Sequence, residues 1–206
     1  MKVISIISQK GGAGKTTIAL HLAVAAELDN KKTAVIDLDP QASSTNWGDS
    51  RAADKPVVVS AQASRLSNIL SSAEEAGATL SIIDTAPHSE SSALAAARSA
   101  DIILIPCRPA ILDLRAINNS IDLARIAGKK AFVLLNANPA RGTLTEEAKK
   151  AIADYKIEIA PVIIGQRSSF VHSLTAGLVA QEFDPSGKAS QEISQLYEWI
   201  CRQIKM

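Results

Sequence analysis

Short apolar runs rich in β-branched residues recur along the chain and alternate with longer stretches that have the spacing of helices. The runs cover residues 3–7, 33–38, 57–60, 80–84, 101–106, 131–136 and 158–164. Helical patterns lie between them, near 16–29, 64–76, 91–98, 112–127 and 144–154. Runs that are apolar almost throughout are typical of parallel strands buried on both faces. The chain is therefore predicted to be an α/β protein with a doubly wound, mostly parallel sheet flanked by helices.

Composition limits the classes of function that this chain can have. Of 206 residues, 47% are hydrophobic, which is enough for a sizeable core, and 3% are aromatic, which is too few for a base-stacking platform. The net charge is +1, with no basic arm or acidic tail, so a contact with DNA would need a local patch. Cys107 and Cys201 have no metal-type spacing and are interpreted as buried thiols. One domain over 1–206 is expected, with a C-terminal helix (about 190–206) docking on it.

The chemically most specific stretch is QKGGAGKTT, residues 9–17, directly after the first apolar run. Its glycines allow successive N–H groups to turn inward around a phosphate, and the following helix presents its positive end. Lys15 supplies charge for the β- and γ-phosphates, and the Thr16 hydroxyl can bind Mg²⁺. This predicts a P-loop NTPase. The residues expected to bind nucleotide here are Gly11, Gly12, Ala13, Gly14, Lys15, Thr16 and Thr17.

The loop departs from the usual pattern at two positions. Gln9 stands where a glycine is usual, and Lys10 is a lysine that a phosphate loop does not itself require. The form K-G-G-x-G-K-T-T closely resembles the deviant Walker A motif of the ParA/MinD (SIMIBI) family of ATPases, and the resemblance covers essentially the whole chain. It implies that Lys10 reaches across a nucleotide-sandwiched dimer to the phosphates of the other subunit. Hydrolysis of ATP to ADP, with Mg²⁺ as cofactor, would then depend on dimerisation.

Two acidic motifs follow predicted strands, AVIDLDPQ at 34–41 and LSIIDTAP at 80–87. Because strand side chains alternate, Asp37 and Asp39 can leave on the same side, toward the carboxyl edge of the sheet. The resemblance implies that Asp39 positions the attacking water and that Asp37 supports the magnesium shell. Asp84 resembles a Walker B acid that holds magnesium-bound water and Thr16, and residues 85–87 resemble a second switch. The expected catalytic residues are Lys10, Lys15 and Asp39, and the expected metal residues are Thr16, Asp37 and Asp84.

The base-binding region is less specific. Asn136, after the sixth apolar run, resembles the base-contacting asparagine of related ATPases, but LNANP is equally a plain turn, and both interpretations stay open. The stretch PVIIGQR at 161–167 occupies the family position that packs beside the base, and Arg167 could serve there or in a basic patch.

The segment DLDPQASSTNW at 37–47 is similar to the short plasmid-type ParA partition ATPases. That resemblance implies a weak ATPase, cytoplasmic and nucleoid-associated, whose ATP-bound homodimer binds DNA without sequence preference. A ParB-like or other cargo adaptor would stimulate hydrolysis and release the dimer, which segregates plasmid or chromosome DNA or positions another cargo. The candidates for the DNA patch are Lys149, Lys150, Lys156, Arg167, Arg202 and Lys205.

Two other functions remain as alternatives. A MinD-like positioning ATPase would bind membrane through its C-terminal helix. In this chain that helix has an apolar stripe flanked by similar numbers of acidic and basic residues, which favours docking on the protein core over anionic lipid. The stripe comprises Ile193, Leu196, Tyr197, Ile200, Cys201 and Ile204. An ATP-dependent synthetase for a small-molecule acid would need a substrate pocket beside the phosphate site, for which a chain of this length is expected to leave little room.

Overall fold

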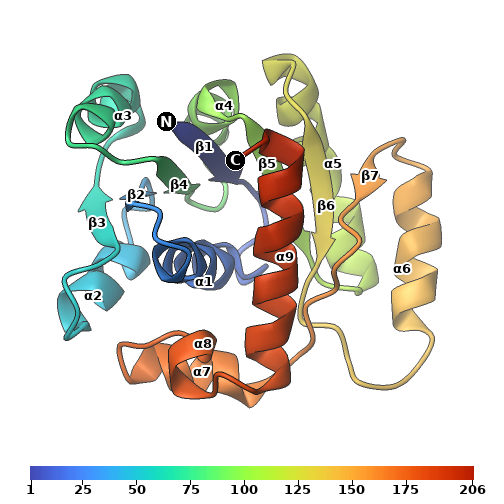
Figure 1. The fold of residues 1–206 in the computed structure, drawn as a ribbon. Coiled ribbons are helices and arrows are strands. Elements are labelled where there is room, and N and C mark those ends of the chain that lie inside the picture. Colours follow the sequence, from blue (N-terminus) through green and yellow to red (C-terminus); the bar gives the residue numbers. More distant parts are fainter.

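The computed structural model describes residues 1–206 and contains one sheet of seven strands, all of them parallel (Figure 1). The strands are β1 (Lys2–Ile6), β2 (Thr33–Asp37), β3 (Val57–Ser60), β4 (Leu80–Asp84), β5 (Ile102–Cys107), β6 (Ala131–Leu135) and β7 (Glu158–Ile159). Their order across the sheet is β3-β2-β4-β1-β5-β6-β7. The predicted fold class is therefore confirmed. In this order, β1 lies in the middle, with β4, β2 and β3 on one side and β5, β6 and β7 on the other, so the strand order reverses beside β1. Ligands bind at such switch points in open α/β sheets.

The connections are mostly helical, as parallel strands require. The helices are α1 (Lys15–Leu28), α2 (Ser43–Ser50), α3 (Leu66–Glu75), α4 (Glu90–Ser99), α5 (Ile111–Ala127), α6 (Leu144–Ala153), α7 (Ser168–Thr175), α8 (Ala180–Phe183) and α9 (Lys188–Ile204), with a short 3₁₀ turn, η1 (Ala63–Arg65), before α3. In Figure 1, α1 and α9 lie over the near face of the sheet and α4 and α5 over the far face.

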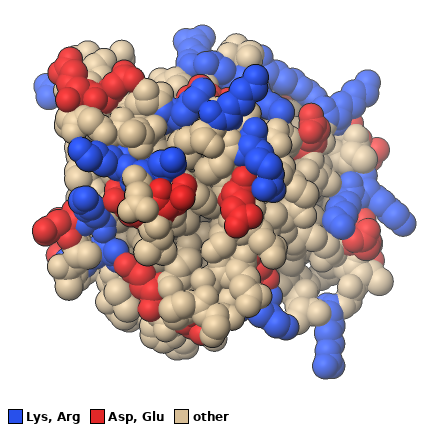
Figure 2. Space-filling view, viewed as in Figure 1, with Lys and Arg blue, Asp and Glu red and all other residues tan.

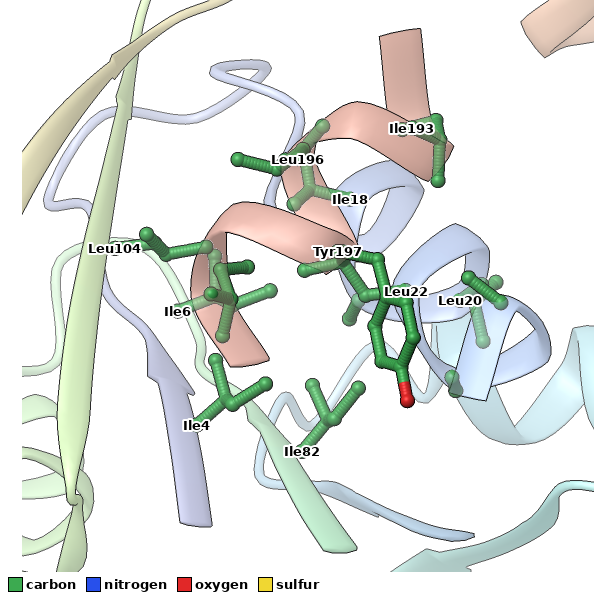
Figure 3. Close-up of a cluster of buried hydrophobic side chains, with 14 of the residues drawn as sticks. Ile4, Ile6, Ile18, Leu20, Leu22, Ile82, Leu104, Ile193, Leu196 and Tyr197 are labelled. Carbon is green, nitrogen blue, oxygen red and sulfur yellow. The ribbon is translucent and has the colours of Figure 1, made fainter. Parts of the chain in front are cut away.

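Each face of the sheet has its own apolar core, because successive strand side chains point in opposite directions. On one face, Ile4, Ile82 and Leu104 pack with α1 and α9 in a cluster of 30 buried residues. Figure 3 shows these strand side chains pointing toward Ile18 of α1 and Leu196 of α9. On the other face, a cluster of 22 buried residues joins alternate strand positions to α4, α5 and α6. Burial on both faces explains why the strands are apolar almost throughout.

Helix α9 carries the apolar stripe seen in the sequence. Ile193, Leu196, Ile200 and Ile204 are buried in the first cluster, and the Tyr197 hydroxyl donates a hydrogen bond to Asp29 Oδ2 at 2.9 Å. The stripe is therefore occupied by contacts with the rest of the chain.

The sequence-based assignment of elements differs from the structure in two places. The last strand is only two residues long instead of covering 158–164. After Ala160 the next N–H bonded to β6 is that of Ile164, so the regular ladder is interrupted at Val162. Helices α2, α7 and α8 were not predicted. They are short, and α2 is polar with only Ser44 and Trp47 buried, so no apolar periodicity marks it.

Candidate nucleotide site

The glycine-rich loop lies between β1 and α1, at the carboxyl edge of the sheet. Gly12 and Gly14 have φ angles of 72° and 96°, in the left-handed region where only glycine is unstrained. A side chain at position 14 would also meet Asn136, since an added Cβ would lie 2.1 Å from Asn136 Nδ2. Two of the three glycines are thus required by the backbone itself, which agrees with a loop shaped to surround a phosphate.

The two lysines of the loop are placed differently. Lys15 is buried at the first turn of α1, and its Nζ donates to the Lys10 carbonyl at 3.4 Å, inside the loop. Burial lowers the pKa of the Lys15 ammonium, while the charges of Asp84 and Asp39 act in the opposite direction. Lys10 is half-buried, and its ammonium makes no hydrogen bond or ion pair within the chain. Lys15 therefore points into the loop, whereas Lys10 is free to contact something outside it.

Asp84 lies at the end of β4 and accepts hydrogen bonds from two hydroxyl groups. Its Oδ2 accepts hydrogen bonds from Thr16 Oγ1 at 2.7 Å and Ser44 Oγ at 2.8 Å, while its Oδ1 is buried without any partner. Burial raises the pKa of the Asp84 carboxyl to about 6, against the opposing effect of the two hydroxyl donors. A buried carboxylate oxygen without a donor fits a cation-binding role, because burial without a partner is otherwise costly. Ser44 was missed from the sequence, where it is one of three neighbouring hydroxyl residues.

Asp37 lies directly beside Asp84, since the two residues are paired in register on β2 and β4. All of its hydrogen bonds are local. Oδ1 accepts from the Asp39 N–H at 3.0 Å, and Oδ2 accepts from the Thr45 N–H at 3.0 Å and its hydroxyl at 3.1 Å. Asp37 thus holds the loop after β2 and the first turn of α2. Asp39 is half-buried further along that loop, with Oδ1 accepting from the Gln41 N–H.

The loops after β2 and β4 form the walls of a cleft of about 1000 Å³, together with the end of β3 and η1. Asp39 lines one wall, and Ala86 and Pro87 of the predicted second switch line another. Thr85 anchors that switch, because its buried hydroxyl donates to the Ile6 carbonyl at 2.9 Å. Ser91 and Ser92 of α4 complete the lining, so the cleft lies between the loops after β2 and β4, η1 and α4.

Asn136 contacts the phosphate loop. It is buried, and its Nδ2 donates to the Ala13 carbonyl at 2.7 Å, next to Gly14. One N–H of its amide group is thus used in supporting the loop.

The six residues predicted for a DNA patch come from α6, the turn after it, the residue before α7 and the end of α9. The guanidinium of Arg167 is held by the Glu192 carboxylate, with Nε 3.0 Å from Oε2, and Lys149 pairs with Glu146 at 2.8 Å. Lys150 is exposed on α6. Arg202 and Lys205 lie at the end of α9, and Lys156 lies between α6 and β7. The sequence-based grouping took no account of the fold, although only the fold decides whether residues far apart in the chain share a surface.

Arg108 is a cation near the loop that sequence reasoning missed. It follows β5, is exposed and makes no side-chain hydrogen bond or ion pair within the chain. Its Nη2 lies 3.6 Å from the position that a Cβ on Gly12 would take. The carboxyl ends of β1 and β5 are neighbours, so a residue just after β5 was a candidate once the strand order was known.

No group of three or more His, Cys, Asp or Glu side chains is arranged to hold a metal ion. Magnesium in phosphate-loop proteins is held by one or two protein oxygens together with nucleotide phosphates and water. Thr16 and the free oxygen of Asp84 fit that donor set.

The comparisons with known proteins agree with this site. Residues 4–199 match the model of the CobQ/CobB/MinD/ParA nucleotide-binding domain, and the chain belongs to this family of P-loop NTPases. It is 28% identical over 206 residues to Maintenance of carboxysome distribution protein A from Gloeobacter kilaueensis, covering 98% of this chain and 94% of that protein. It is 26% identical over 258 residues to Protein IncC from Escherichia coli, covering all of this chain and 71% of that protein.

Solved structures show the same fold at lower identity. McdA from Cyanothece superposes with a TM-score of 0.79 at 17% identity, covering 97% of this chain and 99% of that one. The cell division ATPase MinD from Pyrococcus furiosus superposes with a TM-score of 0.77 at 21% identity, covering 98% of each. Cobyrinic acid a,c-diamide synthase from Mycobacterium smegmatis, solved with ADP and magnesium, superposes with a TM-score of 0.80 at 17% identity, covering 99% and 95%. The fold is thus shared by McdA, by a cell division ATPase and by a synthase.

None of the helices combines the length and the apolar character that crossing a bilayer requires.

Proposed function

We propose that this chain is a Mg²⁺-dependent ATPase of the ParA type, acting as one domain. ATP brings two subunits together through their phosphate loops, the dimer binds DNA without sequence preference, and hydrolysis stimulated by a cargo adaptor separates it. The observation that carries this proposal is the contrast between the lysines, since Lys15 already points into the loop while the ammonium of Lys10 has no partner in its own subunit.

In this proposal, each residue of the site has its own role in ATP hydrolysis. The loop N–H groups and Lys15 bind the phosphates, and Thr16 with Asp84 holds Mg²⁺, which neutralises charge on the β- and γ-phosphates when bound. Asp39, in the wall of the cleft, orients the attacking water. Asp37 orders the loop that carries Asp39 through its backbone contacts. Lys10 of the second subunit completes the charge around the transferred phosphoryl group, so that hydrolysis needs the dimer.

The outer face of the loop supports a dimer contact for a second reason. Arg108 adds another unpartnered cation above Gly12. Lys10 and Arg108 are both cations without a partner in their own subunit, and an anion brought to the loop by the nucleotide of a second subunit would stabilise them. We expect Arg108→Ala to weaken ATP-dependent dimerisation, and Arg108→Lys to retain part of it.

The relatives support positioning rather than another use of ATP. Two relatives that align along almost this whole chain are a carboxysome distribution protein and IncC, and a solved structure with the same fold is the cell division ATPase MinD. The membrane alternative is disfavoured because the apolar stripe of α9 is buried against α1 and the sheet. An amphipathic helix must expose that face to enter a bilayer.

A synthetase remains the second candidate because of one observation, the cleft of about 1000 Å³ beside the predicted switch loops. Its wall includes Arg65 and several hydroxyl side chains, which suit a small acid. Turnover of ATP that rises with a small carboxylic acid, and not with DNA and a protein partner, would favour this candidate.

The experiment that tests the proposal measures binding to random-sequence duplex DNA with ADP, with ATP and with a non-hydrolysable ATP analogue. The wild type is compared with Lys10→Ala and with a control, Lys32→Ala, which removes an exposed lysine at the opposite edge of the sheet. We expect strong binding only with ATP or its analogue, together with a dimer in sedimentation, and loss of both in Lys10→Ala alone. Absence of DNA binding in every nucleotide state would refute the proposal.

A further inference from the structure

The amino edge of the sheet carries four cations around a hollow of about 250 Å³. We call these residues the basic cluster: Arg125, Lys129, Lys130 and Lys156. The first three lie where α5 ends and β6 begins, and Lys156 lies where the chain passes from α6 to β7. Phe132 of β6 pairs with Glu158 of β7, so the two turns leading into these parallel strands lie side by side. The strand pairing therefore brings residues 125–130 and 156 together.

The charges of the basic cluster are only partly neutralised by the protein. Arg125 pairs with Asp122 at 3.2 Å, and Lys130 Nζ donates to the uncharged Gln203 at 2.8 Å. Lys129 and Lys156 are exposed, and their ammonium groups make no hydrogen bond or ion pair within the chain. Glu158 is the only acid that lines the hollow. Four cations against the carboxylates of Asp122 and Glu158 leave an excess of positive charge that an anion can neutralise.

We propose that the basic cluster binds the phosphate groups of a nucleic-acid backbone, and thereby forms the DNA contact on which the proposed function rests. The hollow is lined by charged and aliphatic residues without an aromatic ring, so it offers charge for phosphates but no surface on which bases stack. Such contacts position a duplex without reading its sequence.

The basic surface continues beyond the hollow. The hydrogen bond from Lys130 to Gln203 joins the basic cluster to the last turn of α9, where Arg202 and Lys205 are exposed. Figure 2 shows Lys and Arg side chains gathered along the upper edge of the molecule, above the ends of α5 and α9. A row of cations suits a polyanion better than a single small ion. A lipid surface is disfavoured, because the apolar face of α9 is buried and leaves nothing amphipathic to insert.

The basic cluster lies far from the phosphate loop. The basic cluster precedes β6 and β7, whereas the phosphate loop follows β1, so in a parallel sheet the two lie at opposite edges. Binding of DNA therefore leaves the loop free. A dimer joined through its phosphate loops carries one basic cluster at each outer end, so ATP strengthens binding only where DNA reaches both ends. A single subunit binds DNA weakly and to the same extent with ADP or ATP.

The test is the salt dependence of binding to a random-sequence duplex, with the ATP analogue present. Wild type is compared with the double variant Lys129→Gln/Lys156→Gln, and with Lys149→Gln, which removes a lysine already paired with Glu146. The slope of the logarithm of affinity against the logarithm of salt concentration is expected to fall by about one for each lysine–phosphate pair removed, or about two per subunit. Lys149→Gln should keep the wild-type slope, and all three proteins should keep the same basal ATP turnover.

The outcomes separate this inference from the proposed function. If the wild type binds DNA but the double variant keeps its full slope, the basic cluster is not the contact, although DNA binding stands. If the wild type binds no DNA in any nucleotide state, both fail, and vesicles containing phosphatidylglycerol follow as the probe. Binding to those vesicles that disappears in the double variant would assign the basic cluster to lipid phosphate and overturn the nucleic-acid assignment.

Discussion

Asp37 and Asp84 occupy the same position on neighbouring strands, yet their surroundings give them opposite parts in the molecule. Asp37 is fully buried and accepts three hydrogen bonds, two of them from backbone N–H groups of the loop after β2 and the start of α2. Asp84 is buried to the same extent, but one of its oxygens has no donor. A carboxylate satisfied by its own backbone stabilises the fold, whereas a carboxylate left partly unsatisfied costs stability until a cation arrives.

The largest expected effect is on catalysis at Asp84. Asp84→Asn keeps the size of the side chain and an acceptor for the Thr16 and Ser44 hydroxyls, but removes the charge that we propose holds Mg²⁺. We expect ATP turnover to fall by roughly 100-fold or more, because metal charge stabilisation contributes several kcal/mol. Steady-state turnover over a range of Mg²⁺ concentrations measures this. A variant with near wild-type turnover at low Mg²⁺ would exclude Asp84 from the metal site.

The same substitution should stabilise the nucleotide-free protein, and the gain should depend on pH. Asp84 has a pKa of about 6 when folded, against an ordinary value of 3.8, so the folded state keeps its proton while the unfolded state loses it. The free energy of unfolding of the wild type therefore falls, relative to Asp84→Asn, as the pH rises from about 4 to 6. Two pKa units correspond to about 3 kcal/mol. Urea unfolding of both proteins between pH 4 and 7 measures the difference.

His21 serves as the internal reference in that experiment. Burial lowers its pKa to about 4, so its contribution to stability rises with pH between about 4 and 6.5, opposite in sign to that of Asp84. Because both proteins retain His21, its effect cancels in the difference. A difference that does not change with pH would contradict the raised pKa of Asp84.

Asp37→Asn should change stability in the opposite direction. The amide has one acceptor oxygen instead of two and places an NH₂ group against N–H donors, so at least one of the hydrogen bonds from Asp39 and Thr45 is broken. We expect a decrease of about 1–3 kcal/mol in the free energy of unfolding without nucleotide, at neutral pH. Denaturant unfolding beside Asp84→Asn gives the direct comparison. Two variants with shifts of the same sign would contradict the distinction between the two carboxylates.

The smallest effects concern the neighbouring hydroxyls of α2. Thr45→Val removes the hydroxyl donor of Asp37 with little change in shape, and Ser44→Ala removes one of the two donors of Asp84. Each should lower stability by about 1 kcal/mol. Only Ser44→Ala should also raise the Mg²⁺ concentration needed for half-maximal turnover, because Thr45 makes no hydrogen bond with Asp84. Equal Mg²⁺ dependence in both variants would remove Ser44 from the metal site.

Much of this fold was predictable because its main elements follow local rules. Seven apolar runs correspond to seven strands, with boundaries shifted by one residue in most cases. The exceptions are short or polar: α2 lacks apolar periodicity, and the last strand already ends at Ile159. In the site, the glycine loop, Lys15, Thr16 and Asp84 are brought together as the motifs indicate, because each motif directly follows a central parallel strand.

Sequence alone determined the α/β class, the phosphate loop and the two acids at the carboxyl edge, since these depend on residues close in the chain and on the direction of parallel strands. Only the tertiary structure decided how those groups are used. Three side-chain contacts join segments from 40 to 123 residues apart: Asn136 with the carbonyl of Ala13, Ser44 with Asp84, and Arg108 with the space above Gly12. The basic cluster likewise exists only because β6 and β7 pair. Hydrogen bonding and charge act over a few ångströms of space, whatever the separation along the chain.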